Sequence, residues 1–175
     1  MKNVEIERKF LVTEDNIPDV SMFVYGDTTQ GYIQNIGSSY LYRLRQIIYM
    51  SKNNYCLGEQ YLQTIKGFGT KKREEYEIEL LKPQFSVLWS LCNNLIVHKF
   101  RYEIPIEGTN KHIDFDIYKN NLKGLYTAEV EFNTEEECDA FIPLPWFGME
   151  LTHDTRYSNF QLAVNGLPIN KIENL

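Results

Sequence analysis

Residues 4–12, Val4-Glu5-Ile6-Glu7-Arg8-Lys9-Phe10-Leu11-Val12, alternate between apolar and charged side chains with the period of a β-strand. Successive side chains on a strand point to opposite faces. The apolar face carries Val4, Ile6, Phe10 and Val12, and the charged face carries Glu5, Glu7 and Lys9. Carboxylates two residues apart on a strand are separated by about 6–7 Å, so they can reach one divalent cation or two neighbouring ones. The alternative is an amphipathic strand whose polar face lies in water.

The same two-residue period recurs along most of the chain. The charged or polar positions are Arg43 and Arg45; Thr64 and Lys66; Arg73, Glu75, Glu77 and Glu79; Lys99, Arg101 and Glu103; His112, Asp114 and Asp116; and Glu129 and Glu131. Like charges repel on one strand face unless a ligand of opposite charge lies between them. A divalent cation would explain the acidic pairs, and a phosphate chain would explain the basic ones. Two arrangements remain open, a sheet whose charged face is solvated and a sheet closed around a charged tunnel. The near absence of Ser and Gln at these positions favours the tunnel.

Clusters of turn-forming residues divide the chain into seven or eight antiparallel strands. We expect strands at residues 4–13, 28–35, 40–50, 55–66, 72–80, 95–106, 111–118 and 125–133. Helical spacing predicts helices at residues 83–93, 134–141 and 155–164, the second of them opened by a capping box. Hairpin after hairpin indicates one meandering sheet, large enough to curl or to close into a barrel.

Length and charge limit the class of protein. A chain of 175 residues is expected to form one domain, residues 1–175. Its net charge of −6 argues against a general nucleic-acid or anionic-membrane surface, so an anionic ligand would need a local basic cluster. The three cysteines are widely spaced and no apolar run is long enough to cross a membrane. We therefore expect a cytoplasmic protein with free thiols.

Seven short motifs, in this order, resemble those of the CYTH superfamily, also called triphosphate tunnel metalloenzymes. Glu5-x-Glu7-x-Lys9 resembles the ExExK signature. The others are Arg43-x-Arg45, Thr64-x-Lys66, Arg73-x-Glu75-x-Glu77, Lys99-Phe100-Arg101-Tyr102, Asp116-Ile117-Tyr118 and Glu129-x-Glu131. Together they cover nearly the whole chain.

The resemblance implies a mainly β (α+β) fold, an eight-stranded antiparallel closed β-barrel tunnel with a charged interior and a few peripheral helices. It implies Mg²⁺ or Mn²⁺ as cofactor, with Glu5, Glu7, Asp116, Glu129 and Glu131 as metal ligands. The implied substrate-binding residues are Lys9, Arg43, Arg45, Lys66, Arg73, Lys99, Arg101 and, next to the last helix, Arg156. The implied catalytic residues are Glu5, Glu7 and Lys9, with Glu5 or Glu7 orienting a metal-bound water as the nucleophile.

The C-terminal part of the resemblance favours one reaction. Trp146–Glu150 and Asp154–Asn159 resemble short bacterial members that cleave inorganic triphosphate. We therefore predict a metal-dependent hydrolase of inorganic triphosphate. A class IV adenylyl cyclase making cyclic AMP from ATP is the second reading, and a thiamine triphosphatase is a further one.

Two non-enzymatic readings remain open. The acidic pairs speak against a triphosphate- or nucleotide-binding module, because binding phosphate needs only the cations. A structural barrel with a solvated charged face predicts no polyphosphate binding at all. The expected partner is a small-molecule triphosphate, with no nucleic acid and no membrane. Apolar outer strand faces with few covering helices also favour a homodimer.

Overall fold

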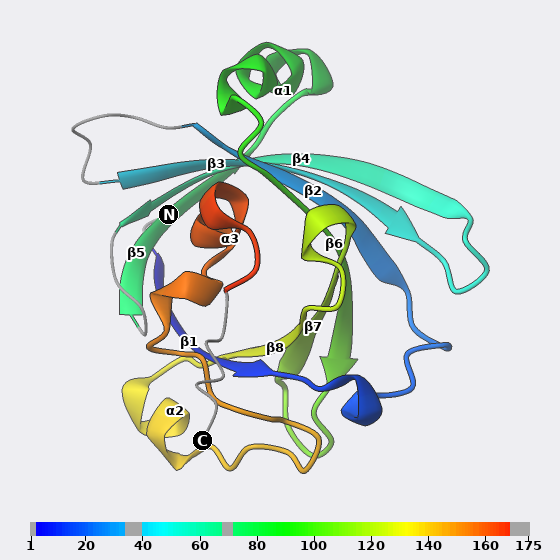
Figure 1. The fold of residues 1–175 in the computed structure, drawn as a ribbon, viewed down its shortest axis with the longest axis vertical. Helices are drawn as coiled ribbons and strands as arrows, with labels where there is room; N and C mark the ends of the chain where they lie inside the picture. The colour runs from blue at the N-terminus through cyan, green and yellow to red at the C-terminus, as the bar shows by residue number, and fades with distance from the viewer. Residues whose placement is uncertain (1–2, 34–39, 68–71, 169–175) are drawn as a thin grey trace, which may run out of the picture.

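The computed structural model describes residues 3–33, 40–67 and 72–168. For residues 3–5, 72 and 73 it describes the backbone alone. These parts form a strongly curled antiparallel sheet with helices around it (Figure 1). The predicted mainly β class, with eight antiparallel strands and few helices, is confirmed.

The eight strands agree with the predicted segments to within three residues at either end. They are β1 (Asn3–Leu11), β2 (Tyr25–Ile33), β3 (Tyr40–Met50), β4 (Cys56–Gly67), β5 (Lys72–Glu79), β6 (Ile96–Pro105), β7 (His112–Tyr118) and β8 (Tyr126–Glu131). The neighbours follow the order β1-β5-β4-β3-β2-β6-β7-β8.

Strand β1 departs from the simple meander that the hairpins predict. It does not pair with β2, which lies between β3 and β6. Its first half, Asn3–Ile6, pairs with β5, and its second half, Glu7–Leu11, pairs with β8. Short turns keep consecutive strands adjacent, whereas the long connections after β1 and after β5 permit a change of neighbour. The expectation of one continuous meander is therefore wrong at these two connections.

Helix α1 (Lys82–Trp89) and the short 3₁₀ helix η2 (Ser90–Cys92) cover the outer face of β3 and β4. The rings of Phe85 and Tyr61 lie 4.8 Å apart between centroids. Gly31 of β2 lets η2 approach closely, since a Cβ there would lie 2.8 Å from the Cys92 sulfur. This packing buries the apolar side of the predicted helix, as its spacing indicates.

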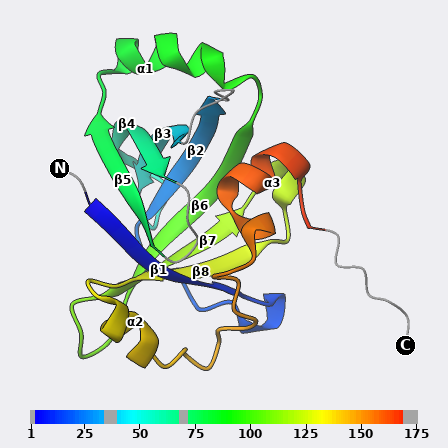
Figure 2. The ribbon, with the colours of Figure 1, turned by 90° about the vertical axis from the view of Figure 1, so that its left-hand side faces the viewer.

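Helix α2 (Glu135–Ala140) lies on the outer face of β1 and β8 (Figure 2). The Thr134 hydroxyl accepts a hydrogen bond from the Glu137 N–H at 3.2 Å, so the predicted N-terminal cap is confirmed. The third predicted helix is divided into η4 (Thr155–Tyr157) and α3 (Asn159–Asn165). Ser158 between them is extended because its side chain caps α3. Helix α3 lies in front of the hollow of the sheet in Figure 1.

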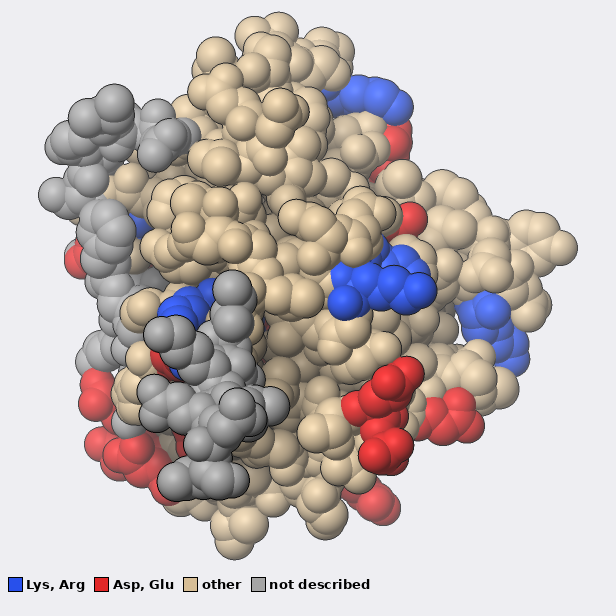
Figure 3. All heavy atoms as spheres, in the orientation of Figure 1, with Lys and Arg blue, Asp and Glu red and all other residues tan. Residues whose placement is uncertain are grey.

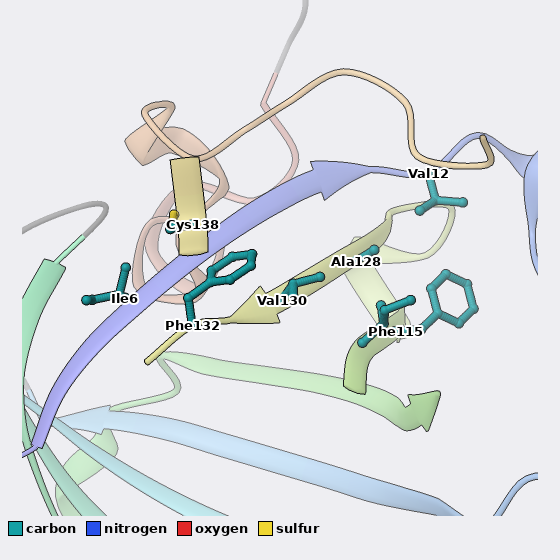
Figure 4. Packing of buried hydrophobic residues seen from close by; sticks show 8 residues of the cluster. Ile6, Val12, Phe115, Ala128, Val130, Phe132 and Cys138 are labelled. Atoms are coloured by element: carbon teal, nitrogen blue, oxygen red, sulfur yellow. The ribbon is translucent and has the colours of Figure 1, made fainter. Parts of the chain in front are cut away.

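The two faces of the sheet differ as the two-residue period predicts. The outer face of β1, β7 and β8 is apolar and packs beneath α2 and the following loop (Figure 4). This cluster consists of Ile6, Val12, Ile113, Phe115, Ala128, Val130, Phe132 and Cys138. Lys9 of β1, Asp116 of β7 and Glu129 of β8 face the inside of the curl, as does Lys99 of β6, and Lys9, Lys99 and Asp116 are buried there.

Three findings bear on the remaining expectations. Cys56, Cys92 and Cys138 are free thiols. Of the helices that the structure describes, not one has the length and apolar character needed to cross a bilayer. Tyr76 and Ile78 are exposed on the outer face of β5, 38% and 58% respectively, and a homodimer stays a prediction.

Candidate active site

One inner wall of the curl is a network of cations and carboxylates on β3, β4 and β5. The register places Arg43 opposite Thr64, Thr64 opposite Glu77, and Lys66 opposite Glu75. The ion pairs are Arg43–Glu75 (3.4 Å), Arg43–Glu77 (3.4 Å), Arg45–Glu77 (3.0 Å) and Lys66–Glu75 (2.9 Å). The strand pattern thus brings together three of the predicted phosphate-binding cations.

The opposite wall is built by β1, β6, β7 and β8 around Arg101. Its guanidinium donates to Asp116 at 2.6 and 2.7 Å, to Glu129 at 2.6 Å, and also to Asp114. Lys99 is 1% exposed and forms an ion pair with Asp116. Buried charges need such partners, since an unpaired one would be strongly destabilising.

Lys9 joins β1 to this wall. Its Nζ lies 3.0 Å from a Glu129 carboxylate oxygen and donates to the carbonyl of Tyr157 at 2.9 Å. Burial alone would lower the pKa of Lys9, but the Glu129 carboxylate, together with Tyr118 and Asp116, outweighs this effect and raises the pKa. The same contacts hold the pKa of Glu129 well below its usual range against the effect of burial. Both side chains are therefore charged at neutral pH.

Two other cations are less completely neutralised. Burial, with the nearby charge of Arg101, lowers the pKa of Lys99 to about 8 although Asp116 opposes the shift. Burial, with the charge of Arg43, lowers the pKa of Arg45 to about 10. Cations that repel one another in a buried site favour an anionic ligand.

A cavity of about 510 Å³ lies between these walls and the C-terminal segment. Its charged lining consists of Glu7, Lys9, Arg43, Lys66, Glu129 and Asp154. Its other side is formed by Tyr32, Leu41, Leu151, Tyr157, Phe160 and polar groups of η4 and α3. The volume suits a small ligand.

All predicted site residues except Glu131 and Arg156 fall into three groups. Glu7, Lys9, Arg43, Lys66 and Glu129 line the cavity. In the part of the chain that the structure describes, Arg45, Lys99, Arg101 and Asp116 are not in its lining and lie in the ion-pair networks beside it. Glu5 and Arg73 are opposite each other in the β1–β5 register, and their side chains lie outside the described residues.

Glu131 and Arg156 lie at the margins of the site. Glu131 is exposed and sits opposite Glu7 in the β1–β8 register. Arg156 is on η4 with its side chain 58% exposed, and it pairs with Asp154 at 2.5 Å. Its neighbours Thr155 and Tyr157 line the cavity. A contact between Arg156 and a substrate stays a prediction.

The carboxylates have the donor type that a hard divalent cation prefers, but their side chains do not form a compact cluster. Among residues with described side chains, no three of the His, Cys, Asp and Glu type are close enough to hold a metal ion together. Glu7 and Glu131 are directly opposite across β1 and β8, and Glu129 is on the same face. Carboxylate oxygens are the ligands that Mg²⁺ and Mn²⁺ prefer. The donor chemistry of this group therefore fits such a cation.

Several cavity residues were missed by the sequence prediction. Tyr32 lines the cavity from the inner face of β2, and Gln30, on the same face but outside the cavity lining, donates from its amide to the Tyr32 hydroxyl at 2.9 Å. The two-residue period could have located both, but they are uncharged and carry no motif. Tyr157 contributes its backbone carbonyl to Lys9, and a backbone contact leaves no signal in the sequence.

Comparison with known proteins identifies close relatives. No protein-family model matches the chain. The chain is 37% identical to an inorganic triphosphatase of Nitrosomonas europaea over 161 residues, which covers 92% of this chain and 97% of that protein. It is 30% identical to an inorganic triphosphatase of Acetivibrio thermocellus, covering 92% and 94% of the two chains.

Solved structures agree with these relatives. The crystal structure of the inorganic triphosphatase NE1496 matches with a TM-score of 0.63 and 36% identity, over 94% of this chain and 96% of that one. A candidate adenylate cyclase from Bacillus halodurans matches with a TM-score of 0.51 and 18% identity, over 79% and 85% of the chains. The second match supports the fold alone.

Proposed function

The chain belongs to the inorganic triphosphatase family, within the CYTH superfamily of triphosphate tunnel enzymes, and we propose that it hydrolyses inorganic triphosphate. The observation that carries this proposal is the convergence of Lys9, Arg43 and Lys66 on one cavity. They come from three different strands, so only the folded chain brings them together.

Arg43 supports phosphate binding most directly. It is 8% exposed, and its Nε–H is buried with no hydrogen-bond partner among the described residues. An unpaired buried donor is costly, and an oxygen of a bound phosphate would satisfy it. The planar guanidinium suits forked contacts with phosphate, and the ammonium groups of Lys9 and Lys66 act as point charges. Phosphate oxygens would thereby replace carboxylates as partners of these cations.

The curl of the sheet would enclose this substrate as a tunnel. Its two walls are joined through β1, which pairs with β5 at one end and with β8 at the other. Enclosure would exclude water and strengthen every contact between cation and phosphate. The closed tunnel with a charged interior is part of this proposal.

A divalent cation, Mg²⁺ or Mn²⁺, is the proposed cofactor. Glu7, Glu129 and Glu131 are its candidate ligands by donor type, with Glu5 and Asp116 as further candidates, and these side chains would have to converge when the cation binds. When bound, such a cation neutralises charge on the phosphate oxygens during transfer. The remaining groups bind and orient: Lys9 and Arg43 hold the phosphate chain, while the Glu7 carboxylate in the cavity orients the attacking water.

A second candidate function follows from the apolar side of the cavity. The rings of Tyr32 and Phe160 meet edge to face with centroids 5.4 Å apart. Such a surface would accept the organic group of ATP or thiamine triphosphate. Cyclisation of ATP, as in class IV adenylyl cyclases, and hydrolysis of thiamine triphosphate are therefore the alternatives.

The substrate is tested by offering inorganic triphosphate, ATP and thiamine triphosphate in parallel with Mg²⁺ or Mn²⁺. We expect phosphate release to be fastest from inorganic triphosphate, with no cyclic AMP formed from ATP. Cyclic AMP formation would replace the proposal with the cyclase alternative. Binding of triphosphate with no turnover of any of the three would indicate a binding module.

A further inference from the structure

Arg8 lies between two predicted catalytic residues but points away from the cavity. It sits on the outer face of β1, whereas Glu7 and Lys9 line the cavity. Its guanidinium forms a fork with the Glu150 carboxylate, with Nε–Oε1 at 2.9 Å and Nη2–Oε2 at 2.7 Å. Its Nη1 donates to the carbonyl of Phe141, just after α2, at 2.9 Å. An Arg in this position cannot touch a ligand in the cavity.

A chain of hydrogen bonds leads from Arg8 back to the cavity. The Thr152 hydroxyl donates to Glu150 Oε1 at 2.7 Å and accepts from the backbone N–H of Lys9 at 3.1 Å. Thr152 itself lines the cavity. Forked ion pairs fix geometry more strongly than single contacts do. Arg8 therefore orients Glu150, and Glu150 orients the hydroxyl beside Lys9.

The same region pairs with β1 through its backbone. Leu151 N–H donates to Lys9 C=O at 2.7 Å, Leu11 N–H to Met149 C=O at 2.8 Å, and Gly148 N–H to Leu11 C=O at 2.8 Å. A Cβ on Gly148 would lie 2.8 Å from the Leu11 carbonyl oxygen, so the two backbones are in close contact. Residues 148–152 are thus fastened to the second half of β1, which pairs with β8 on its other side.

Residues 152–161, which continue directly from this hydrogen-bonded segment, form the C-terminal wall of the cavity. The wall contributes Thr152, Asp154, Thr155, Tyr157, Ser158 and Phe160, among others. The hydrogen bonds between residues 148–152 and β1 set the position of this wall relative to the side chains of β1. The Lys9–Tyr157 hydrogen bond depends on that position.

We propose that Arg8, acting through Glu150 and Thr152, is a positioning residue that holds the C-terminal wall against Glu7 and Lys9. This inference rests on the proposed hydrolysis of triphosphate. Loss of the fork would let the wall move relative to Lys9, and displacements of about 1 Å can cost roughly 100-fold in rate.

Kinetics on inorganic triphosphate test the inference with Arg8→Met, Glu150→Gln and the double variant. We expect kcat/KM to fall about 10- to 100-fold in each single variant, mainly through a higher KM. Because both residues act in one chain of contacts, the double variant is expected to be no worse than the poorer single one. Arg8→Lys, which keeps the charge and loses the fork, is expected to recover part of the loss. The matched control is Lys111→Met, which breaks a 2.7 Å ion pair with Glu137 away from the cavity and should leave activity unchanged.

Amide hydrogen exchange gives a readout that does not depend on activity. Peptides covering residues 151–161, and the amide of Lys9, are expected to exchange faster in Arg8→Met than in wild type or Lys111→Met. Wild-type kinetics together with unchanged exchange in Arg8→Met, or losses that multiply in the double variant, would overturn the inference. If the wild type releases no phosphate, the proposed function fails, and the exchange experiment alone decides the role of Arg8. If Arg8→Met does not fold, Arg8→Lys and Thr152→Val provide the same comparisons.

Discussion

The ammonium group of Lys9 and the carboxylate of Glu129 lie 3.0 Å apart across the β1–β8 pair, inside the curl of the sheet. Both residues line the cavity, and Arg101 also donates to Glu129 at 2.6 Å. The pair connects the first strand to the ion network of β6, β7 and β8. It therefore contributes both to the stability of the sheet and to the proposed binding site.

Removal of one member of this pair should destabilise the fold more than removal of both. We expect Lys9→Met to lower the free energy of unfolding by roughly 3 kcal/mol, because it leaves the Glu129 charge buried with fewer partners. Lys9→Met/Glu129→Gln should be more stable than Lys9→Met, although it is equally unable to bind phosphate through this lysine. Urea unfolding of the wild type, Lys9→Met, Glu129→Gln and the double variant measures both differences. A double variant less stable than either single one would contradict the pairing.

Arg43 should determine affinity for triphosphate through its forked donors. Arg43→Lys keeps the charge but loses the geometry, and one charge-assisted hydrogen bond is worth about 1.5–3 kcal/mol. We expect triphosphate to bind roughly 10- to 100-fold more weakly. Titration calorimetry with triphosphate and Mg²⁺ measures this. Lys82→Met, which removes a cation with a 64% exposed side chain at the start of α1, is the control and should bind as wild type does.

The pKa of Lys99 should make stability depend on pH on the alkaline side. Burial lowers this pKa from 10.5 to about 8, so between these values the unfolded chain binds more protons than the folded one. Stability contributed by this group therefore rises as pH increases from about 8 to 10.5. The unfolding free energy of wild type minus that of Lys99→Met should rise over this range. A difference that stays flat, or falls, would show that Lys99 is not perturbed by its buried site.

The two-residue period predicted the strands and their two faces well, because each strand turns one face to the inside of the curl and the other to the outside, where helices or solvent lie. Counting alone assigned Lys9, Arg43, Lys66 and Glu129 to the charged face of their strands, and the structure places this face on the inside of the curl. The neighbours of β1 were not, because long connections do not reveal which strands pair. The division between cavity residues and the ion pairs around Arg101 also required the structure. It depends on distances across the sheet that no single strand encodes.

The C-terminal wall gives a second example of contacts that the sequence alone did not predict. The family resemblance placed a helix near the site and singled out Arg156, yet the group of this region that contacts the Lys9 ammonium is the carbonyl of Tyr157. Asp154 holds Arg156 at the surface, with contacts of 2.8 and 2.5 Å. A local acidic neighbour thus holds at the surface a side chain that the family resemblance assigned to the substrate, and a contact between Arg156 and a substrate stays a prediction.

The measurement that tests the central claim most directly is phosphate release from inorganic triphosphate by wild type and Glu7→Gln, with Mg²⁺, with Mn²⁺ and with chelator. Glu14→Gln, which changes an exposed carboxylate of η1, is the control. We predict release that requires the cation, a loss of about 100-fold or more in Glu7→Gln, and no loss in Glu14→Gln. Absence of release from the wild type with either cation, or full activity of Glu7→Gln, would contradict the assignment of this cavity as a metal-dependent triphosphatase site.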